Sequence, residues 1–295
     1  MLLSQLVGRP FNSSGLGEEG RASRMATLEG KTLFISGASR GIGKAIALDL
    51  AREGVDVVIA SRTMSELEQT AREIENQTGR RAIPMAVDVT SREQVDRVVD
   101  EAASRLGGLH ILVNSASLPG GSPSAVGPIA TLDEGELLSD FAVKYVGALR
   151  CARAAIPYLK EQGWGRIINI SGTNARRAGN LSGGARNTSL VHLTKTLAVQ
   201  LGQFGITVNC IHPGITRTER TPGLLAARAA QLGVTPEEVE RRDYDPDGSG
   251  GNSIGRMVDA DEVAYVSTFL SSDKAWAVTG ELIIATGGAG DSVYY

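Results

Sequence analysis

The chain has 295 residues, of which 42% are hydrophobic and 21% are charged, and these are the proportions of an ordinary globular protein. A formal net charge of −3 argues against a general binder of nucleic acid or of membrane surfaces. No apolar run approaches the ~20 residues that cross a bilayer. With two cysteines and three histidines, the sequence gives no basis for a disulfide framework or a metal centre. We therefore expect a cytoplasmic protein that binds neither nucleic acid nor membranes.

The stretch from Lys31 to Gly43, KTLFISGASRGIG, has the pattern of a strand, a glycine-rich turn and the start of a helix. Residues 33–35 form the short apolar run of a buried strand, and a helical period follows from Lys44 to Glu53. Such a geometry directs backbone N–H groups and a helix N-terminus at a phosphate. Glycine permits the close approach that a Cβ would block. We therefore predict a dinucleotide phosphate site that comprises Gly37, Ser39, Arg40, Gly41, Ile42 and Gly43.

Strand and helix patterns alternate along the rest of the chain. Strands are predicted at 55–60, 82–87, 110–113, 165–171, 206–211 and 281–284, and helices at 65–78, 91–106, 132–161, 184–204 and 259–270. The alternation contains no repeat and no second block. It predicts one α/β domain, a Rossmann-like doubly wound parallel sheet with helices on both faces. We place this domain at residues 28–290, between a flexible arm of residues 1–27 and a tail of residues 291–295.

Arg62 follows the second predicted strand, where a doubly wound sheet meets the adenosine ribose of a dinucleotide. An acidic residue there would bind the 2′-hydroxyl of NAD. Arg62 and Arg40 instead suit a 2′-phosphate, because guanidinium groups form paired, charge-assisted bonds to phosphate. The alternative is that both arginines are solvated surface side chains. We predict NADP(H) in preference to NAD(H).

The spacing Gly-x-x-x-Gly-x-Gly, with Ala38-Ser39-Arg40 inside it, resembles that of the short-chain dehydrogenase/reductase family. The resemblance extends from Leu28 to about Gly288. It implies contacts to the adenine ring and a Pro-Gly turn beside the nicotinamide. It also implies a turn after the fourth strand, which in most family members has the sequence Asn-Asn-Ala-Gly. The matching residues are Asp88, Val89, Asn114, Ala116, Pro213 and Gly214.

The resemblance also bears on the lid and on assembly. Residues 215–255 hold turn signals and no strand pattern, and they match the family's substrate lid. The family commonly pairs through two long helices, which here correspond to 132–161 and 184–204. We therefore expect a homodimer or a homotetramer.

The family's reaction is hydride transfer between nicotinamide C4 and a carbonyl or carbinol carbon. Its catalytic set is a tyrosine that supplies the proton, a lysine four residues later, a serine and an asparagine. The flanking patterns put these four positions at Gly183, Asn187, Gly172 and Lys144. Neither glycine nor asparagine donates a proton near neutral pH. The resemblance therefore implies a divergent member that lacks the usual Asn-Ser-Tyr-Lys set.

Cationic side chains border the expected substrate cleft, namely Lys144, Arg176, Arg177 and Arg186. They favour a small substrate with a carboxylate or phosphate group, and the alternative is that the arginines are solvated loop residues. Lys144 is the candidate proton donor if burial lowers its pKa. Three functions remain open. We put first an NADP(H)-dependent oxidoreductase of a carbonyl or alcohol, ahead of a non-redox enzyme (hydrolysis or elimination) and an inactive cofactor-binding subunit.

Overall fold

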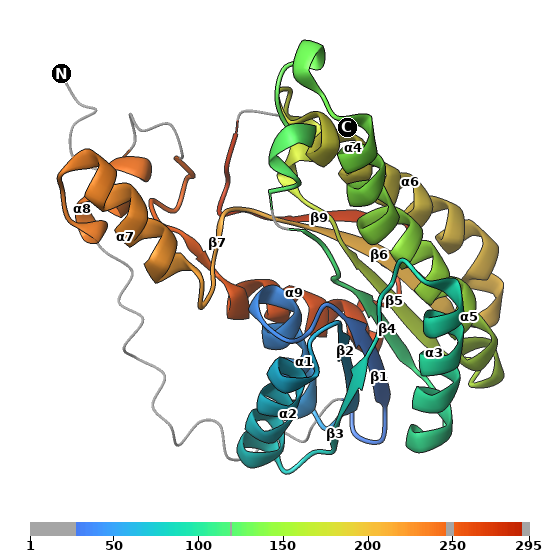
Figure 1. The fold of residues 1–295 in the computed structure, drawn as a ribbon. Helices are drawn as coiled ribbons and strands as arrows, with labels where there is room; N and C mark the ends of the chain where they lie inside the picture. Colours follow the sequence, from blue (N-terminus) through green and yellow to red (C-terminus); the bar gives the residue numbers. More distant parts are fainter. Residues whose placement is uncertain (1–27, 119, 246–250, 291–295) are drawn as a thin grey trace, which may run out of the picture.

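A computed structural model of the chain describes residues 28–118, 120–245 and 251–290, and its main feature is a seven-stranded sheet (Figure 1). The strand order is β3-β2-β1-β4-β5-β6-β9, and every neighbouring pair is parallel. The strands are β1 Thr32–Ser36, β2 Asp56–Ser61, β3 Ala82–Ala86, β4 Ile111–Asn114, β5 Gly165–Ile170, β6 Ile206–Pro213 and β9 Leu282–Ala285. Each of the predicted strands overlaps one of them. The predicted α/β fold is confirmed.

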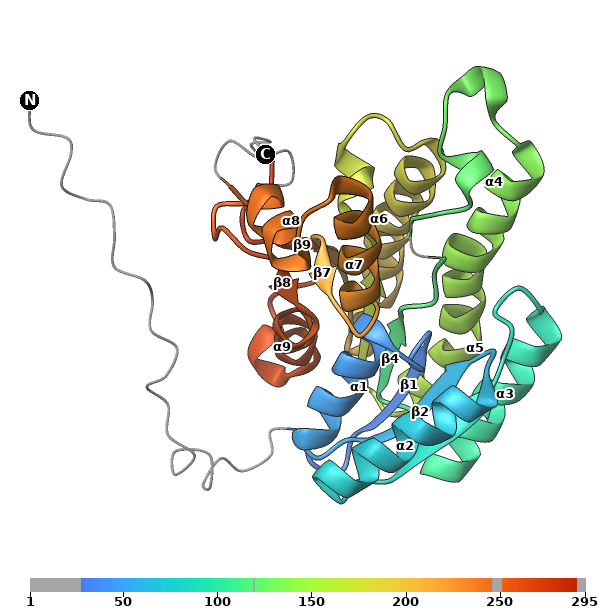
Figure 2. The ribbon, with the colours of Figure 1, turned by 60° about the vertical axis from the view of Figure 1, so that its left-hand side comes forward.

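Helices cover both faces of the sheet (Figures 1 and 2). One hydrophobic cluster joins the sheet to α1 Gly41–Arg52, α2 Met64–Thr78 and α9 Ala260–Ser271. A second cluster joins the other face to α3 Arg92–Leu106, α5 Gly147–Glu161 and α6 Leu181–Leu201. Because both faces are covered, β1 and β6 are buried at every position. This burial explains why the strands read as apolar runs rather than as alternating patterns.

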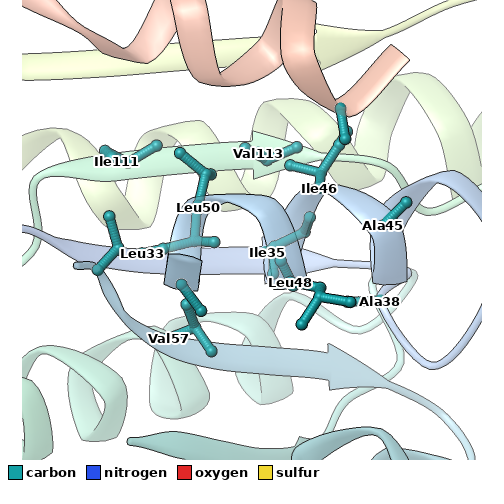
Figure 3. Close-up of a cluster of buried hydrophobic side chains, with 14 of the residues drawn as sticks. Leu33, Ile35, Ala38, Ala45, Ile46, Leu48, Leu50, Val57, Ile111 and Val113 are labelled. Carbon is teal, nitrogen blue, oxygen red and sulfur yellow. The ribbon is translucent and has the colours of Figure 1, made fainter. Parts of the chain in front are cut away.

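The first cluster fixes the angle between β1 and α1 (Figure 3). Leu33 and Ile35 of β1 lie beneath Ile46 and Leu50 of α1, and all four side chains are fully buried. Each buried aliphatic side chain of this kind contributes about 1.5–3 kcal/mol to folding. The turn between β1 and α1 is therefore held by packing on both sides.

The chain changes direction between β1 and β4. It runs outward from β1 to β2 and β3, and then returns to β4 on the other side of β1. In open parallel sheets, ligands bind at the carboxyl ends of the strands that flank such a switch point. Gly37 follows β1, and Ala116 follows β4. A Cβ on Gly37 would lie 2.6 Å from the backbone nitrogen of Ala116, so only glycine fits there.

The predicted long helix of residues 132–161 is interrupted. It consists of α4 Glu134–Phe141, a π-helical turn Ala142–Val146 and α5. The wide turn carries Lys144. Single π-turns inside α-helices occur frequently at functional sites.

The segment between β6 and α9, where the sequence predicts no strand over residues 215–255, contains two helices and one short strand in that range. Two helices, α7 Thr221–Leu232 and α8 Pro236–Asp243, pack on each other through a small cluster of their own. The two-residue strand β7 Thr216–Arg217 pairs with β8 Val258–Asp259. The helix signal in the sequence was a proline in the first turn of each helix, together with the cap of α8, where Thr235 Oγ1 accepts from the Glu238 N–H at 3.2 Å.

The predicted arm of residues 1–27 and the predicted tail of residues 291–295 lie outside the described residues. Within the described ranges, no helix combines the length and the apolar character that a membrane span requires.

Candidate active site

The turn between β1 and α1 has the backbone conformation that a phosphate loop needs. Gly37 and Gly41 have φ values of 73° and 60°, in the left-handed region. A Cβ on Gly43 would lie 2.2 Å from the carbonyl oxygen of Gly37, so α1 can start close to the turn only because this residue is glycine. Ser39 and Ile42 lie in the same turn, and both are partly exposed.

The N-terminus of α1 already binds a carboxylate. Its first turn, which lies wholly within the described residues, carries no acidic side chain, and Arg40 gives no side-chain cap. The backbone N–H of Gly41 instead donates to Oε1 of Glu219 at 2.8 Å. Glu219 comes from the segment between β7 and α7, so part of the predicted lid reaches the phosphate turn. An anion of the protein thus occupies an end of α1 where the helix dipole favours negative charge.

Arg40 and Arg62 lie at the carboxyl ends of the neighbouring strands β1 and β2, and both are exposed. Arg40 pairs with Glu66 at 3.6 Å. Partial burial of Asp88 acts to raise its pKa, but hydrogen bonds from the N–H and Oγ1 of Thr90, together with the charges of Arg62 and Arg150, lower that pKa overall. The structure therefore brings the two predicted arginines and Asp88 to one edge of the sheet.

Hydrogen bonds to neighbouring strands hold the residues at the ends of β4 and β6. The Asn114 amide is buried and donates to Asn169 Oδ1 at 2.9 Å, while its own Oδ1 has no hydrogen-bond partner among the described residues. Pro213 closes β6, and the Gly214 N–H donates to the carbonyl of Ala285 at 3.0 Å. Val89 is buried against Gly147 of α5, so the two predicted adenine residues differ in exposure.

Lys144 is buried in the π-helical turn. Its Nζ donates to the backbone carbonyl of Ser171, just after β5, at 2.9 Å. Burial and the charge of Arg186 together lower the pKa of Lys144 to about 7, and Cys210 opposes the shift. A lysine with this pKa is present in both protonation states at neutral pH, so it can release a proton to a reacting group.

Arg186 does not belong to a cationic substrate cleft, contrary to the prediction. Its Nη2 donates to the carbonyl of Leu118 at 3.0 Å, and its Nη1 lies 3.8 Å from Oδ2 of Asp140. Asp140 also accepts from the Ser122 N–H and from Ser182 Oγ. A buried guanidinium requires such partners. The network ties the loop after β4 to α6, and it connects groups too far apart in the chain to be predicted from local patterns.

Asparagine amides occupy the space beside the two glycines at the expected catalytic positions. A Cβ on Gly172 would lie 2.8 Å from Nδ2 of Asn187. A Cβ on Gly183 would lie 2.7 Å from Nδ2 of Asn174 and 2.9 Å from the amide of Asn180. Asn180 also caps α6, because its Oδ1 accepts from the Gly183 N–H at 2.6 Å. These glycines therefore do not border free space.

A cavity of about 220 Å³ opens at the carboxyl ends of β6 and β9. Its polar lining comes from Arg176, Arg177 and Thr173 after β5, from His212 of β6, and from Tyr244 and Asn252 of the segment between β6 and α9. Among the described residues, no aspartate or glutamate lines it. Lys144 is also absent from the described lining. Two of the four predicted cations, Arg176 and Arg177, therefore line the cavity, whereas Lys144 and Arg186 are buried and are not among the described residues that line it.

His212 is the site residue that the sequence analysis missed. Its side chain is 1% exposed, and neither ring nitrogen has a hydrogen-bond partner among the described residues. Burial, together with the charges of Lys144 and Arg176, lowers the pKa of His212 to about 4. The available signal was a histidine directly before a Pro-Gly turn at a strand end.

A phosphate turn at the switch point of a parallel sheet, with a polar cavity at the carboxyl ends of the strands, defines a nucleotide-binding enzyme of the doubly wound class. The chain belongs to the short-chain dehydrogenase/reductase family of oxidoreductases. A family model described as enoyl-(acyl carrier protein) reductase matches residues 37–290.

Three similar proteins illustrate the family. The chain is 33% identical to a short chain dehydrogenase/reductase, astE, of Aspergillus oryzae over 265 residues, which cover 89% of this chain and 95% of that protein. It is 29% identical to the NADPH-dependent reductase BacG of Bacillus subtilis over 266 residues, which cover 89% of this chain and 99% of that protein. The crystal structure of L-sorbose reductase from Gluconobacter frateurii, complexed with NADPH and L-sorbose, matches with a TM-score of 0.83 and 28% identity, covering 92% of this chain and 100% of that one.

Proposed function

We propose that the protein is an NADP(H)-dependent oxidoreductase that interconverts a carbonyl and an alcohol on a small anionic substrate, with Lys144 as the source of the proton. The observation that carries this proposal is the buried Lys144. It is held at 2.9 Å by the carbonyl that follows β5, and its pKa is about 7. A general acid is most effective when its pKa lies near the working pH.

The residues around the phosphate turn fit NADP(H). Gly37, Gly41 and Gly43 let the backbone approach a pyrophosphate, and the carboxylate of Glu219 on the Gly41 N–H stands in for a phosphate oxygen. Arg40 and Arg62 suit the 2′-phosphate. The remaining residues proposed to contact the cofactor are Ser39, Ile42, Asp88, Val89, Asn114, Ala116, Pro213 and Gly214. Names of relatives that specify NADPH support this choice. When bound, the cofactor supplies or accepts the hydride.

The proposal includes a departure from the usual catalytic set. Gly172, Gly183 and Asn187 lie where the family has serine, tyrosine and lysine. The amides beside the two glycines support this reading, because Asn174 and Asn180 leave no room for a phenol at Gly183. A substitute acid is then required, and Lys144 is the buried amine of this region.

The lining of the cavity supports an anionic substrate. Arg176 and Arg177 contribute two guanidinium groups to this lining. A carboxylate or a phosphate group on the substrate forms charge-assisted hydrogen bonds to such groups. The segment of residues 215–255 acts as a lid in this account, because it reaches both the phosphate turn through Glu219 and the cavity through Tyr244.

The experiment is a titration of the purified chain with NADPH and NADH, followed by an NADPH-consumption assay. The substrate panel pairs 2-oxo acids, 3-oxo acids and phosphorylated ketones with the neutral ketone of matching size. We expect turnover of at least one anionic member that exceeds turnover of its neutral partner. Binding of NADPH with no turnover of any member would favour the inactive cofactor-binding subunit, and absence of NADPH binding would overturn the proposal.

A further inference from the structure

His212 connects the buried lysine to the cavity. The β5–β6 register pairs Ile170 with Ile211, and the Ser171 N–H donates to the Ile211 carbonyl at 2.9 Å. His212 is therefore the neighbour of Ser171, whose carbonyl holds Nζ of Lys144. The imidazole lines the cavity, whereas Lys144 is not among the described residues that do so.

Both nitrogens of this ring are without partners. The His212 side chain is 99% buried, and neither Nδ1 nor Nε2 forms a hydrogen bond with another described residue. Buried polar atoms are almost always satisfied, so an exception requires a physical reason. A ligand in the cavity would be such a reason, because the ligand can form a hydrogen bond with the His212 ring nitrogen that faces the cavity.

The ring is neutral at the pH where Lys144 titrates. The charges of Lys144 and Arg176 both act on His212, and with burial they hold its pKa near 4. A neutral imidazole has one N–H donor and one acceptor nitrogen. It can therefore take a proton at one nitrogen while it releases a proton from the other.

We propose that His212 relays the proton from Lys144 to the substrate oxygen, a role that rests on the proposed function. As the carbonyl carbon gains the hydride, its oxygen takes the proton of the imidazole N–H. The other ring nitrogen takes a proton from the Lys144 ammonium, directly or through one water molecule. The ring is neutral before and after the step, Lys144 is left as a neutral amine, and solvent later returns its proton. In the oxidation direction each transfer is reversed.

The same geometry assigns the substrate class. The reacting oxygen must lie at His212, and Arg176 and Arg177 line the same cavity of about 220 Å³. This volume is below the about 300–1,000 Å³ of sites that hold drug-sized ligands. A short oxo acid fits these constraints, with its carbonyl at the imidazole and its carboxylate at the arginines.

The kinetic test uses His212→Phe and His212→Gln on the full chain, with His192→Gln as the control because His192 is an exposed residue of α6. Glutamine keeps an N–H donor but cannot relay. We expect both His212 variants to lower kcat on the best panel substrate by at least about 100-fold, with little change of KM in the glutamine variant and an unchanged Kd for NADPH. The double variant His212→Phe/Lys144→Met should lower kcat by no more than either single change, because the two residues act as one unit.

A spectroscopic test does not depend on turnover. Imidazole ¹⁵N resonances of the chain, with NADP⁺ bound, are recorded on titration with pyruvate and with acetone as its neutral counterpart. We expect the His212 resonances, assigned with the glutamine variant, to shift with pyruvate and the His192 resonances to stay constant. Native kcat in both His212 variants would overturn the relay while leaving the proposed function intact. If no panel member is turned over, the relay is overturned when the His212 resonances do not shift on titration with pyruvate.

Discussion

The backbone N–H of Gly41 donates a 2.8 Å hydrogen bond to Oε1 of Glu219, a residue 178 positions later in the chain. The bond joins the phosphate turn to the segment that leads into α7. Because the carboxylate sits where we expect a cofactor phosphate, cofactor and Glu219 compete for the same N–H group. We therefore expect NADPH binding to displace Glu219 from the Gly41 N–H.

Replacing Glu219 should tighten cofactor binding. A charge at a helix N-terminus contributes about 0.3–1 kcal/mol, so Glu219→Gln should lower the Kd for NADPH by about 2- to 5-fold. Glu237→Gln changes an exposed carboxylate of α8 in the same way and should leave the Kd unchanged. Fluorescence titration measures both. Weaker binding by Glu219→Gln would mean that the carboxylate supports the cofactor site.

Arg62 should set the cofactor preference. Arg62→Asp removes a charge-assisted contact to the 2′-phosphate, which is worth about 1.5–3 kcal/mol, or roughly 10- to 150-fold in the Kd for NADPH. NADH binding should not weaken. Arg72→Asp is the control, since Arg72 is an exposed residue of α2. Equal affinity of the unmutated protein for NADPH and NADH would contradict this prediction.

Lys144 should make the free energy of unfolding depend on pH. Its pKa is lowered from 10.5 to about 7 in the folded state, so between these values the unfolded chain binds more protons. Stability attributable to Lys144 therefore rises with pH across this window, by at most about 1.4 kcal/mol per pH unit. Urea unfolding from pH 7 to 9 should show a steeper rise for the native protein than for Lys144→Met. Parallel pH profiles would show that the lysine is not buried as an amine.

The chain should assemble through α5 and α6 into a homodimer or a homotetramer. Val199 is 76% exposed and lies on α6, one of the two helices through which we expect the subunits to pair. Light scattering at micromolar concentration should give a multiple of the 31.0 kDa chain mass. Val199→Asp should shift the population toward the monomer, whereas Leu224→Asp on α7 should not. A monomeric native protein would refute the expected assembly.

Features that depend on short stretches of the chain could be predicted from the sequence. The strand, the turn and the helix of the phosphate site lie in one short stretch, and their glycines have the close contacts that the spacing implied. Buried parallel strands read as apolar runs, so all seven could be located. The two helices α7 and α8 were not predicted, although each has a proline in its first turn.

What the sequence did not predict depends on long-range contacts. Arg186 was expected to border the substrate cleft, but it lies 3.8 Å from the carboxylate of Asp140. The burial of Lys144 and the missing partners of His212 depend on how α5, β5 and β6 pack. The hydrogen bond between Gly41 and Glu219 also depends on a long-range contact. The candidate cofactor residues were therefore accessible to pattern reasoning, whereas the candidate proton path required the fold.

The most direct test of the central claim is the kcat for NADPH-dependent reduction of the best oxo-acid substrate by Lys144→Met. Lys195→Met is the matched control, because Lys195 lies on the exposed side of α6 and pairs with Glu281 at 3.7 Å. If Lys144 supplies the proton, Lys144→Met lowers kcat by at least about 100-fold, with an unchanged Kd for NADPH, and Lys195→Met retains native turnover. Native turnover in Lys144→Met would contradict the account and remove Lys144 from the mechanism.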